Sequence, residues 1–140
     1  MANILIVDDD VAVQATIRLV LERAGHRVTT ASDGKKAIEL FETGAFDLIF
    51  LDIFMPGMDG LETMRLIRRQ QPGIPIVVIS GRPIAPDGYS EPDFLAMATK
   101  LGAIASLQKP FKPAALLAAV ETSLAAAEPT KSGPGTTLIT

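Results

Sequence analysis

Hydrophobic and polar positions follow two alternating patterns along the chain. Five short runs, rich in β-branched and other aliphatic residues, have the composition of buried strands. They cover residues 3–7, 26–31, 46–51, 74–79 and 103–107. The third run is apolar nearly throughout, so we expect its strand to lie at the centre of a sheet.

Each run is followed by a segment whose apolar residues recur at the spacing of one helix face. These periodic residues lie within 13–24, 32–44, 61–67, 94–101 and 117–124. Gly25, Gly44 and Gly102 stand where helices commonly end. Residues 128–140 show no such period, so we predict one domain over residues 1–127 and a flexible tail over residues 128–140.

Strict alternation of five strands and five helices predicts an α/β fold, with a parallel sheet covered by helices on both faces. Right-handed crossovers leave few strand orders open. We predict a doubly wound, flavodoxin-like (βα)5 sheet of order 2-1-3-4-5. Functional groups in such a sheet gather at the carboxyl ends of the strands, beside the switch point between strands 1 and 3.

Composition narrows the classes of function. The chain has 140 residues, of which 48% are hydrophobic and 21% charged, enough apolar material for one core. A net charge of −3 argues against direct nucleic-acid binding. There is no cysteine for disulfides or thiolate chemistry. We see no signal peptide and no bilayer-spanning run, so we expect a cytoplasmic protein without membrane insertion.

Acidic residues follow two strands that the predicted order makes neighbours. Asp8, Asp9 and Asp10 come directly after the first strand, and Asp52 follows the third. Carboxylates crowded together repel one another, and a hard divalent cation removes that conflict. Mg²⁺ prefers oxygen ligands and is commonly held by one or two carboxylates together with phosphate oxygens. The pattern therefore predicts a site for Mg²⁺ and a phosphoryl group.

Asp52 is then the candidate nucleophile, because a carboxylate oxygen can attack phosphorus and form an aspartyl phosphate. Phosphoryl transfer depends mostly on positioning and charge stabilisation. Lys109, after the fifth strand, offers an ammonium to one phosphoryl oxygen, and Ser80, after the fourth, offers a hydroxyl to another. Gly81 leaves room for an incoming phosphodonor.

Each of these residues also has an ordinary explanation. The acidic run can cap the first helix, a role we expect for Asp10. Asp52 alone could be a loop acid, and Lys109 a surface lysine before a proline. Together, however, the ends of four predicted strands supply three acids, a further acid, a hydroxyl and an amine, and this combination is much harder to explain by chance. For His26, the sole histidine, we predict an ordinary surface position.

The motifs "ILIVDDD", "DLIFLDIFMPGMDG", "VVIS" and "QKPF" occur in that order. With them the chain resembles the receiver domain of two-component response regulators over residues 4–124. The second motif is specific to that family, whereas the others are informative through their order. The resemblance implies that Asp52 accepts a phosphoryl group from a phosphohistidine, carried by a sensor histidine kinase or a histidine phosphotransfer protein.

The resemblance also implies roles for the surrounding residues. Asp9 and Asp52 would bind Mg²⁺ directly, and Asp8 would act largely through water. The backbone carbonyl of Phe54 would be a further ligand. Ser80 and Lys109 match the hydroxyl and the lysine of the family's motif.

The sequence departs from the family pattern at two places. The stretch of residues 81–93, with three prolines, is longer than usual, and we predict either a lid or partner-contact element or a tolerated insertion. Ser106 replaces the aromatic residue often found three positions before the lysine, and it is too small to take the part of that ring, which in the family couples the hydroxyl residue to the outer face of the fourth helix, fifth strand and fifth helix. Phe54 and Arg82 are expected to flank the phosphoryl group and modulate its hydrolysis.

The preferred hypothesis is therefore a signalling switch, whose only catalysed steps are its own phosphorylation and dephosphorylation. Its output would be a population shift read by a downstream protein target or a separate output domain. No output domain fits after Leu124, so the chain is either a stand-alone regulator or a receiver cut from a longer protein. Two alternatives stay open: a Mg²⁺-dependent phosphatase of the haloacid-dehalogenase type, and a phosphate-independent binding module of the same fold.

Overall fold

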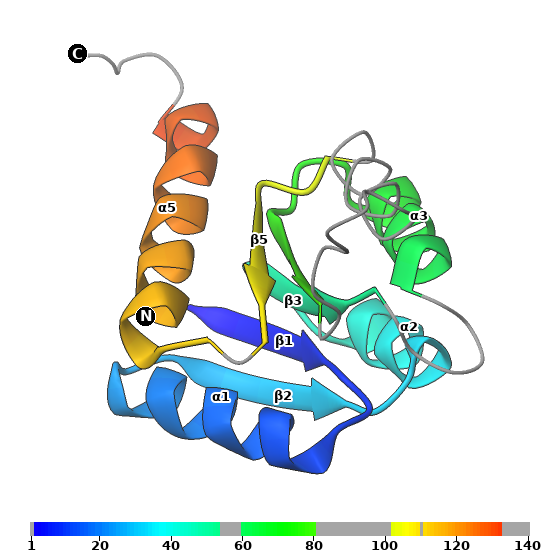
Figure 1. Cartoon of the computed structure of the whole chain (residues 1–140). Helices are drawn as coiled ribbons and strands as arrows, with labels where there is room; N and C mark the ends of the chain where they lie inside the picture. Colours follow the sequence, from blue (N-terminus) through cyan, green and yellow to red (C-terminus); the bar gives the residue numbers. More distant parts are fainter. Residues whose placement is uncertain (1, 54–59, 81–101, 110, 133–140) are drawn as a thin grey trace, which may run out of the picture.

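The computed structural model describes residues 2–53, 60–80, 102–109 and 111–132. Five parallel strands form one sheet in the order β2-β1-β3-β4-β5, as predicted. The strands are β1 (Asn3–Val7), β2 (Arg27–Ala31), β3 (Leu48–Asp52), β4 (Ile76–Ser80) and β5 (Ala105–Gln108). The described helices are α1 (Val11–Arg23), α2 (Gly34–Thr43), α3 (Gly60–Gln70) and α5 (Pro113–Ser132). Helices α1 and α5 cover one face of the sheet, and α2 and α3 cover the other (Figure 1).

The core has two halves because successive strand residues point to opposite faces of the sheet. Strand β1 gives Leu5 and Val7 to the half under α2 and α3, and Ile4 and Ile6 to the half under α1 and α5. In β3, which is buried along its whole length, Phe50 belongs to the second half. A strand with both faces covered reads as an unbroken apolar run. The predicted central position of the third run is therefore confirmed.

Strands β3 and β4 begin two residues later than the apolar runs that predicted them. The residues before them are nevertheless buried: Phe46 is stacked on Phe41 of α2 with ring centroids 6.4 Å apart, and Ile74 lies in the same half of the core. A run of apolar residues therefore reports burial, whereas ladder hydrogen bonds set the strand boundary. The helix predicted over residues 94–101 lies outside the described residues.

The ends of two helices follow the polar signals in the sequence. The Asp10 carboxylate caps α1, accepting hydrogen bonds from the backbone N–H groups of Ala12 (2.9 Å) and Val13 (3.4 Å). Asp33 caps α2 in the same way, with the N–H of Lys36 as donor. Gly25 follows α1 with φ +95°, a conformation that favours glycine. The predicted capping role of Asp10 is thus confirmed.

Helix α5 continues to Ser132, past the point at which the sequence pattern predicted a tail. Residues 128–132 are therefore helical, although the apolar period does not continue through them. Residues 133–140 lie outside the described part of the chain. None of the described helices combines the length and the apolar character that crossing a membrane requires.

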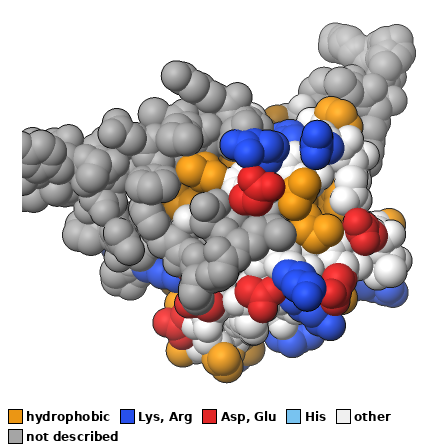
Figure 2. All heavy atoms as spheres, turned by 90° about the vertical axis from the view of Figure 1, so that its right-hand side faces the viewer, with side chains coloured by type: hydrophobic (Ala, Val, Ile, Leu, Met, Phe, Trp, Pro, Cys, Tyr) orange, Lys and Arg blue, Asp and Glu red, His pale blue; other side chains and the backbone are white. Residues whose placement is uncertain are grey.

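The surface over α2 and α3 carries charges of both signs. Figure 2 shows lysine and arginine side chains interspersed with acidic ones on the described part of this face. One pair, Arg65 and Glu62 of α3, forms an exposed ion pair at 2.9 Å. Mixed charge of this kind is typical of a solvated face, and the described part of it shows no basic stripe of the kind that binds nucleic acid.

His26 is partly buried, contrary to the predicted surface position. Its Nδ1 atom accepts a hydrogen bond from the backbone N–H of Ala2 at 3.0 Å, which ties the turn before β2 to the start of β1. Burial lowers the pKa of His26, and the positive charge of the chain's N-terminus lowers it further. The folded protein therefore favours the neutral imidazole, whose Nδ1 lone pair is needed as acceptor.

The first prediction concerns pH. Because the folded state binds the His26 proton less readily than the unfolded state, this contribution to stability is present above the unfolded pKa of about 6.5 and is lost as the pH falls from there through the lower pKa of the folded state. Urea unfolding between pH 8 and pH 5 should show this loss, and NMR should place the His26 pKa below its ordinary value. The H26Q variant cannot titrate and should lack this part of the pH dependence. An NMR pKa at or above 6.5 would contradict the account.

Candidate functional site

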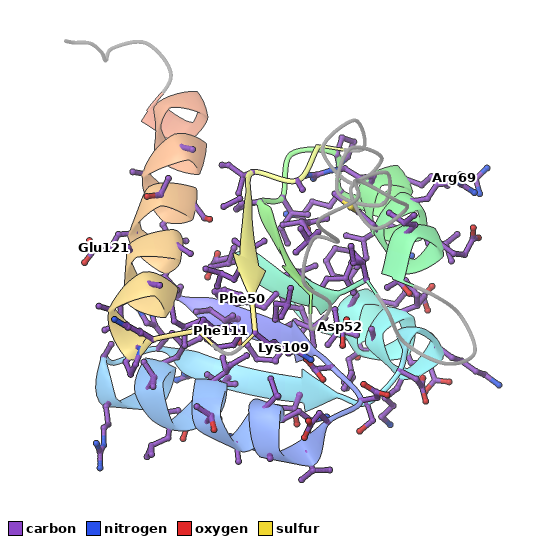
Figure 3. All side chains as sticks on the ribbon, viewed as in Figure 1. Phe50, Asp52, Arg69, Lys109, Phe111 and Glu121 are labelled. Carbon is purple, nitrogen blue, oxygen red and sulfur yellow. The ribbon has the colours of Figure 1, made fainter. Side chains whose placement is uncertain are left out.

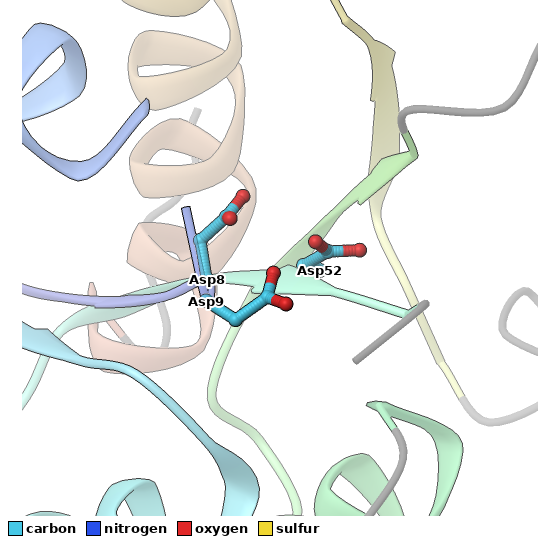
Figure 4. A group of neighbouring side chains, drawn as sticks. All are labelled: Asp8, Asp9 and Asp52. Atoms are coloured by element: carbon cyan, nitrogen blue, oxygen red, sulfur yellow. The ribbon is translucent and has the colours of Figure 1, made fainter. Parts of the chain in front are cut away.

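Three aspartates meet at the carboxyl edge of the sheet. Strand β1 pairs with β3 so that Val7 lies opposite Leu51, which brings the residues that follow them, Asp8 and Asp52, to adjacent positions. One carboxylate oxygen from each of Asp8, Asp9 and Asp52 lies within 4.8 Å of the others. Figure 4 shows the three carboxylates converging from the ends of the two strands. The predicted meeting of acids from the first and third strands is therefore present.

The three acids differ in burial. Asp8 is fully buried, and its Oδ1 accepts a hydrogen bond from the backbone N–H of Asp10 at 2.8 Å. Asp52, the last residue of β3, is 3% exposed, whereas Asp9 is exposed to solvent. A buried carboxylate is costly unless it is paired or hydrogen-bonded. The site therefore has two acids held in place inside the fold and a third that opens towards solvent.

Lys109 supplies the opposite charge. Its Nζ lies 2.7 Å from Asp8 Oδ2 and 3.2 Å from Asp52 Oδ2, and only 19% of the lysine side chain is exposed. Asp52 and Lys109 point towards one another in Figure 3, whereas Arg69 and Glu121 point away from the molecule. Burial alone would lower the pKa of Lys109, but Asp8 and Asp52 outweigh it and raise the pKa above its usual value. Lys109 is therefore held as an ammonium between two carboxylates.

One lysine does not balance three carboxylates. With Asp8, Asp9, Asp52 and Lys109 in their ordinary charge states, the group has a formal net charge of −2. Its ligands are all oxygens, and its exposed member, Asp9, leaves access for water. Both properties suit Mg²⁺, which takes oxygen ligands and retains several waters. The described residues thus fit a divalent cation of this kind.

Gly60 contributes to the site in a way that the sequence reasoning missed. It begins α3, and a Cβ atom there would lie 2.5 Å from the carbonyl oxygen of Asp52 and would also clash with Ile53. The glycine of "MDG" thus allows the start of α3 to press against the backbone that carries Asp52. No local signal separates a turn glycine from one that is needed for close approach.

Several predicted site residues are described only in part. Ser80 ends β4 and pairs with Gln108, the residue before Lys109, so its backbone lies at the same sheet edge. Ser106 lies within β5, paired with Val78. The side chains of both serines fall outside the described part of the structure. Phe54, Gly81 and Arg82, and the predicted lid at residues 81–93, also lie outside the described residues.

Gln14 is a second residue that the sequence reasoning missed. It is buried and donates hydrogen bonds to the ends of β1 and β2, next to Asp8. Gln14, Ile17 and Leu21 are the buried residues of α1. A polar residue at a core-facing position of an amphipathic helix is the signal that could have revealed it.

Comparison with known proteins points to one family. The family model described as "Response regulator receiver domain" matches residues 4–121. The transcriptional regulatory protein FixJ of Bradyrhizobium diazoefficiens is 32% identical over 127 residues, which cover 91% of this chain and 58% of FixJ. PhoP of Bacillus subtilis, an alkaline phosphatase synthesis transcriptional regulatory protein, is 34% identical over 90% of this chain and 50% of PhoP. The chain thus spans about half the length of these relatives.

Solved structures give the same result. A receiver domain protein from Methanospirillum hungatei superimposes with a TM-score of 0.83 at 28% identity, covering 95% of this chain and 99% of its own. NtrX from Brucella abortus reaches a TM-score of 0.85 at 30% identity, covering 99% of this chain and 30% of NtrX. The chain belongs to the response regulator receiver domain family of two-component systems.

The second prediction tests the lysine between the two buried acids. Lys109→Met removes the only described positive charge in contact with Asp8 and Asp52. We expect the free energy of unfolding without Mg²⁺ to fall by about 2 kcal/mol, less than the ~3–5 kcal/mol for a fully buried pair because Lys109 is partly exposed. Urea unfolding followed by circular dichroism measures the change.

Lys112→Met is the matched control, because Lys112 is exposed three residues further along the chain. It should change stability by no more than about 0.5 kcal/mol. Saturating Mg²⁺ should restore part of the loss in Lys109→Met, since it supplies positive charge to the same carboxylates. Equal losses in the two lysine variants would contradict the proposed charge balance.

Proposed function

We propose that this receiver domain is a phosphorylation switch in which Asp52 accepts a phosphoryl group with the help of Mg²⁺. The observation that carries the proposal is the convergence of Asp8, Asp9 and Asp52 on one point, with Lys109 in contact with two of them. The phosphodonor would be a phosphohistidine of a sensor histidine kinase or a histidine phosphotransfer protein. Membership of the receiver family supports that choice of donor.

Asp52, Lys109 and Asp8 have different roles in the proposed phosphoryl transfer. An oxygen of the Asp52 carboxylate attacks phosphorus, and a P–O bond forms while the P–N bond to the donor imidazole breaks. The bonding electrons leave with the imidazole nitrogen, so no base is required on Asp52. Lys109 already lies 3.2 Å from Asp52 Oδ2, where its ammonium can contact an oxygen of the transferred group. Asp8, 2.7 Å from the same ammonium, keeps Lys109 in place.

The metal ligands are assigned as part of the same proposal. Asp9 and Asp52 would hold Mg²⁺ directly, Asp8 would act through water, and the carbonyl of Phe54 would complete the protein ligands. Bound Mg²⁺ supplies positive charge that offsets the charge of the phosphoryl oxygens and of the aspartates. The Ser80 hydroxyl would contact a further phosphoryl oxygen, a role supported by the place of its backbone beside Gln108.

The output would be a change in the population of two conformations, read by another protein or by an output domain. FixJ and PhoP, named as transcriptional regulatory proteins, extend well beyond the region that this chain matches. Their names support an output coupled to gene regulation, with nucleic acid contacted elsewhere than in the receiver. We further propose that the protein acts in the cytoplasm and that it does not turn over a separate substrate.

The two alternatives fit the site less well. A phosphatase of the haloacid-dehalogenase type would use the acid after β1 as nucleophile and would leave Asp52 without a role. Asp52 is instead buried and paired with Lys109. A phosphate-independent module would have no use for three converging carboxylates, whose mutual repulsion opposes folding.

The third prediction tests the phosphoacceptor. Wild-type protein mixed with acetyl phosphate and Mg²⁺ should gain the mass of one phosphoryl group in intact-mass spectrometry. Asp52→Asn should gain none, because the amide is a poor nucleophile. Asp10→Asn is the matched control: Asp10 is a neighbouring exposed acid outside the converging group, and asparagine is equally good as a helix cap.

Asp10→Asn should be phosphorylated like the wild type. A phosphorylated Asp52→Asn variant would overturn the assignment and indicate Asp8 as nucleophile, as the phosphatase alternative requires. A wild-type protein that gains no phosphoryl mass would favour the phosphate-independent module.

A further inference from the structure

Gln14 occupies a place where an apolar residue would be expected. It is the fourth residue of α1, is only 9% exposed, and lies with Ile17 and Leu21 among the buried residues of that helix. A buried amide is costly unless its polar atoms are hydrogen-bonded. The partners of Gln14 therefore indicate why a polar side chain is there.

The partners of Gln14 are all oxygens at the carboxyl ends of two strands. Its Nε2 donates to the carbonyl oxygen of Asp8 at the end of β1 and to Ser32 Oγ at 3.2 Å after β2. The carbonyl oxygen of Ala31 lies 3.5 Å from the same nitrogen. Because the two carbonyl oxygens can only accept, the amide nitrogen of Gln14 has to face them. One side chain thus joins α1 to the ends of β1 and β2.

The bond to Asp8 acts on the peptide that links Asp8 to Asp9. The Asp8 N–H donates to Ala31 O at 3.0 Å, which ties this residue to β2, and Asp8 Oδ1 accepts from the Asp10 N–H. Gln14 holds the remaining backbone group of Asp8, its carbonyl oxygen. The orientation of that carbonyl sets the plane of the next peptide and hence the direction in which Asp9 leaves the backbone.

We propose that Gln14 is a positioning residue that orients the Asp8–Asp9 peptide for binding of a divalent cation. The inference rests on the proposed function, because it assumes that Asp8, Asp9 and Asp52 hold Mg²⁺. Groups that hydrogen-bond to metal-binding residues orient them, and their loss commonly weakens metal binding 10–100-fold. Asp9 is exposed to solvent, so its direction depends on how the backbone presents it.

The experiment compares Mg²⁺ affinity in two variants of α1. Gln14→Met keeps the length of the side chain and its burial but removes the donor. Ile17→Val, the matched control, removes one methyl group from a fully buried residue of the same helix without touching Asp8. Isothermal titration with Mg²⁺ should give a dissociation constant about tenfold higher for Gln14→Met. That for Ile17→Val should lie within twofold of the wild type.

A second readout needs no metal. In Mg²⁺-free protein, the amide NMR signal of Asp9 should shift in Gln14→Met, because the Asp8 carbonyl in that peptide loses its hydrogen bond, and should not shift in Ile17→Val. If Gln14→Met does not fold, Gln14→Asn serves instead, since its shorter amide does not reach Asp8, and the same tenfold loss is expected.

The outcomes separate the two proposals. A wild type that binds Mg²⁺ together with a Gln14→Met variant of unchanged affinity would overturn the positioning role and leave the proposed function intact. An equal loss of affinity in Gln14→Met and Ile17→Val would also overturn it, since general loosening of α1 would then suffice. A wild type that binds no Mg²⁺ would overturn both proposals.

Discussion

The site depends on the electrostatic conflict between Asp8 and Asp52, two buried carboxylates at neighbouring strand ends. Lys109 relieves that conflict only in part, with contacts of 2.7 and 3.2 Å, and the addition of Asp9 leaves the group with a negative excess. Burial strengthens both attraction and repulsion, because the surroundings are less polar than water. The fold therefore retains negative charge that its own side chains do not neutralise, and this excess favours a divalent cation, whose positive charge can in turn offset that of a phosphoryl group.

The parallel sheet makes this arrangement possible. In the order β2-β1-β3-β4-β5, every strand delivers its carboxyl end to one edge, so residues separated by 44 or 57 positions become neighbours. The apolar strands fix those ends rigidly, since β1 and β3 have core on both faces. Close approach of α3 through Gly60 and the amide of Gln14 then restrain the backbone at the two acidic positions. Catalysis of phosphoryl transfer depends largely on positioning of this kind.

Much of the fold and of the acidic site could be predicted from the sequence. The spacing of apolar residues and the polar residues that follow each strand are both local signals. The apolar runs that end just before Asp8 and just before Asp52 predicted the sheet and the meeting of the acids. Gln14 and Gly60 could not be assigned in the same way, because their roles are contacts with backbone atoms that only the folded chain brings near. His26 was misplaced for the same reason: its partner, the N–H of Ala2, is 24 residues away. The extension of α5 to Ser132 was missed because residues 128–132 carry no apolar period, which is the signal from which the helices were predicted.

The central claim is that one divalent cation is shared by carboxylates from the ends of β1 and β3. Mn²⁺, which prefers the same oxygen ligands as Mg²⁺, broadens the NMR signals of nuclei near it. Substoichiometric Mn²⁺ should first broaden the amides of Asp9 and Ile53, and excess Mg²⁺ should restore them. Broadening that begins instead at other acids, such as Glu39 and Glu42 of α2, while Asp9 and Ile53 stay sharp would contradict the account.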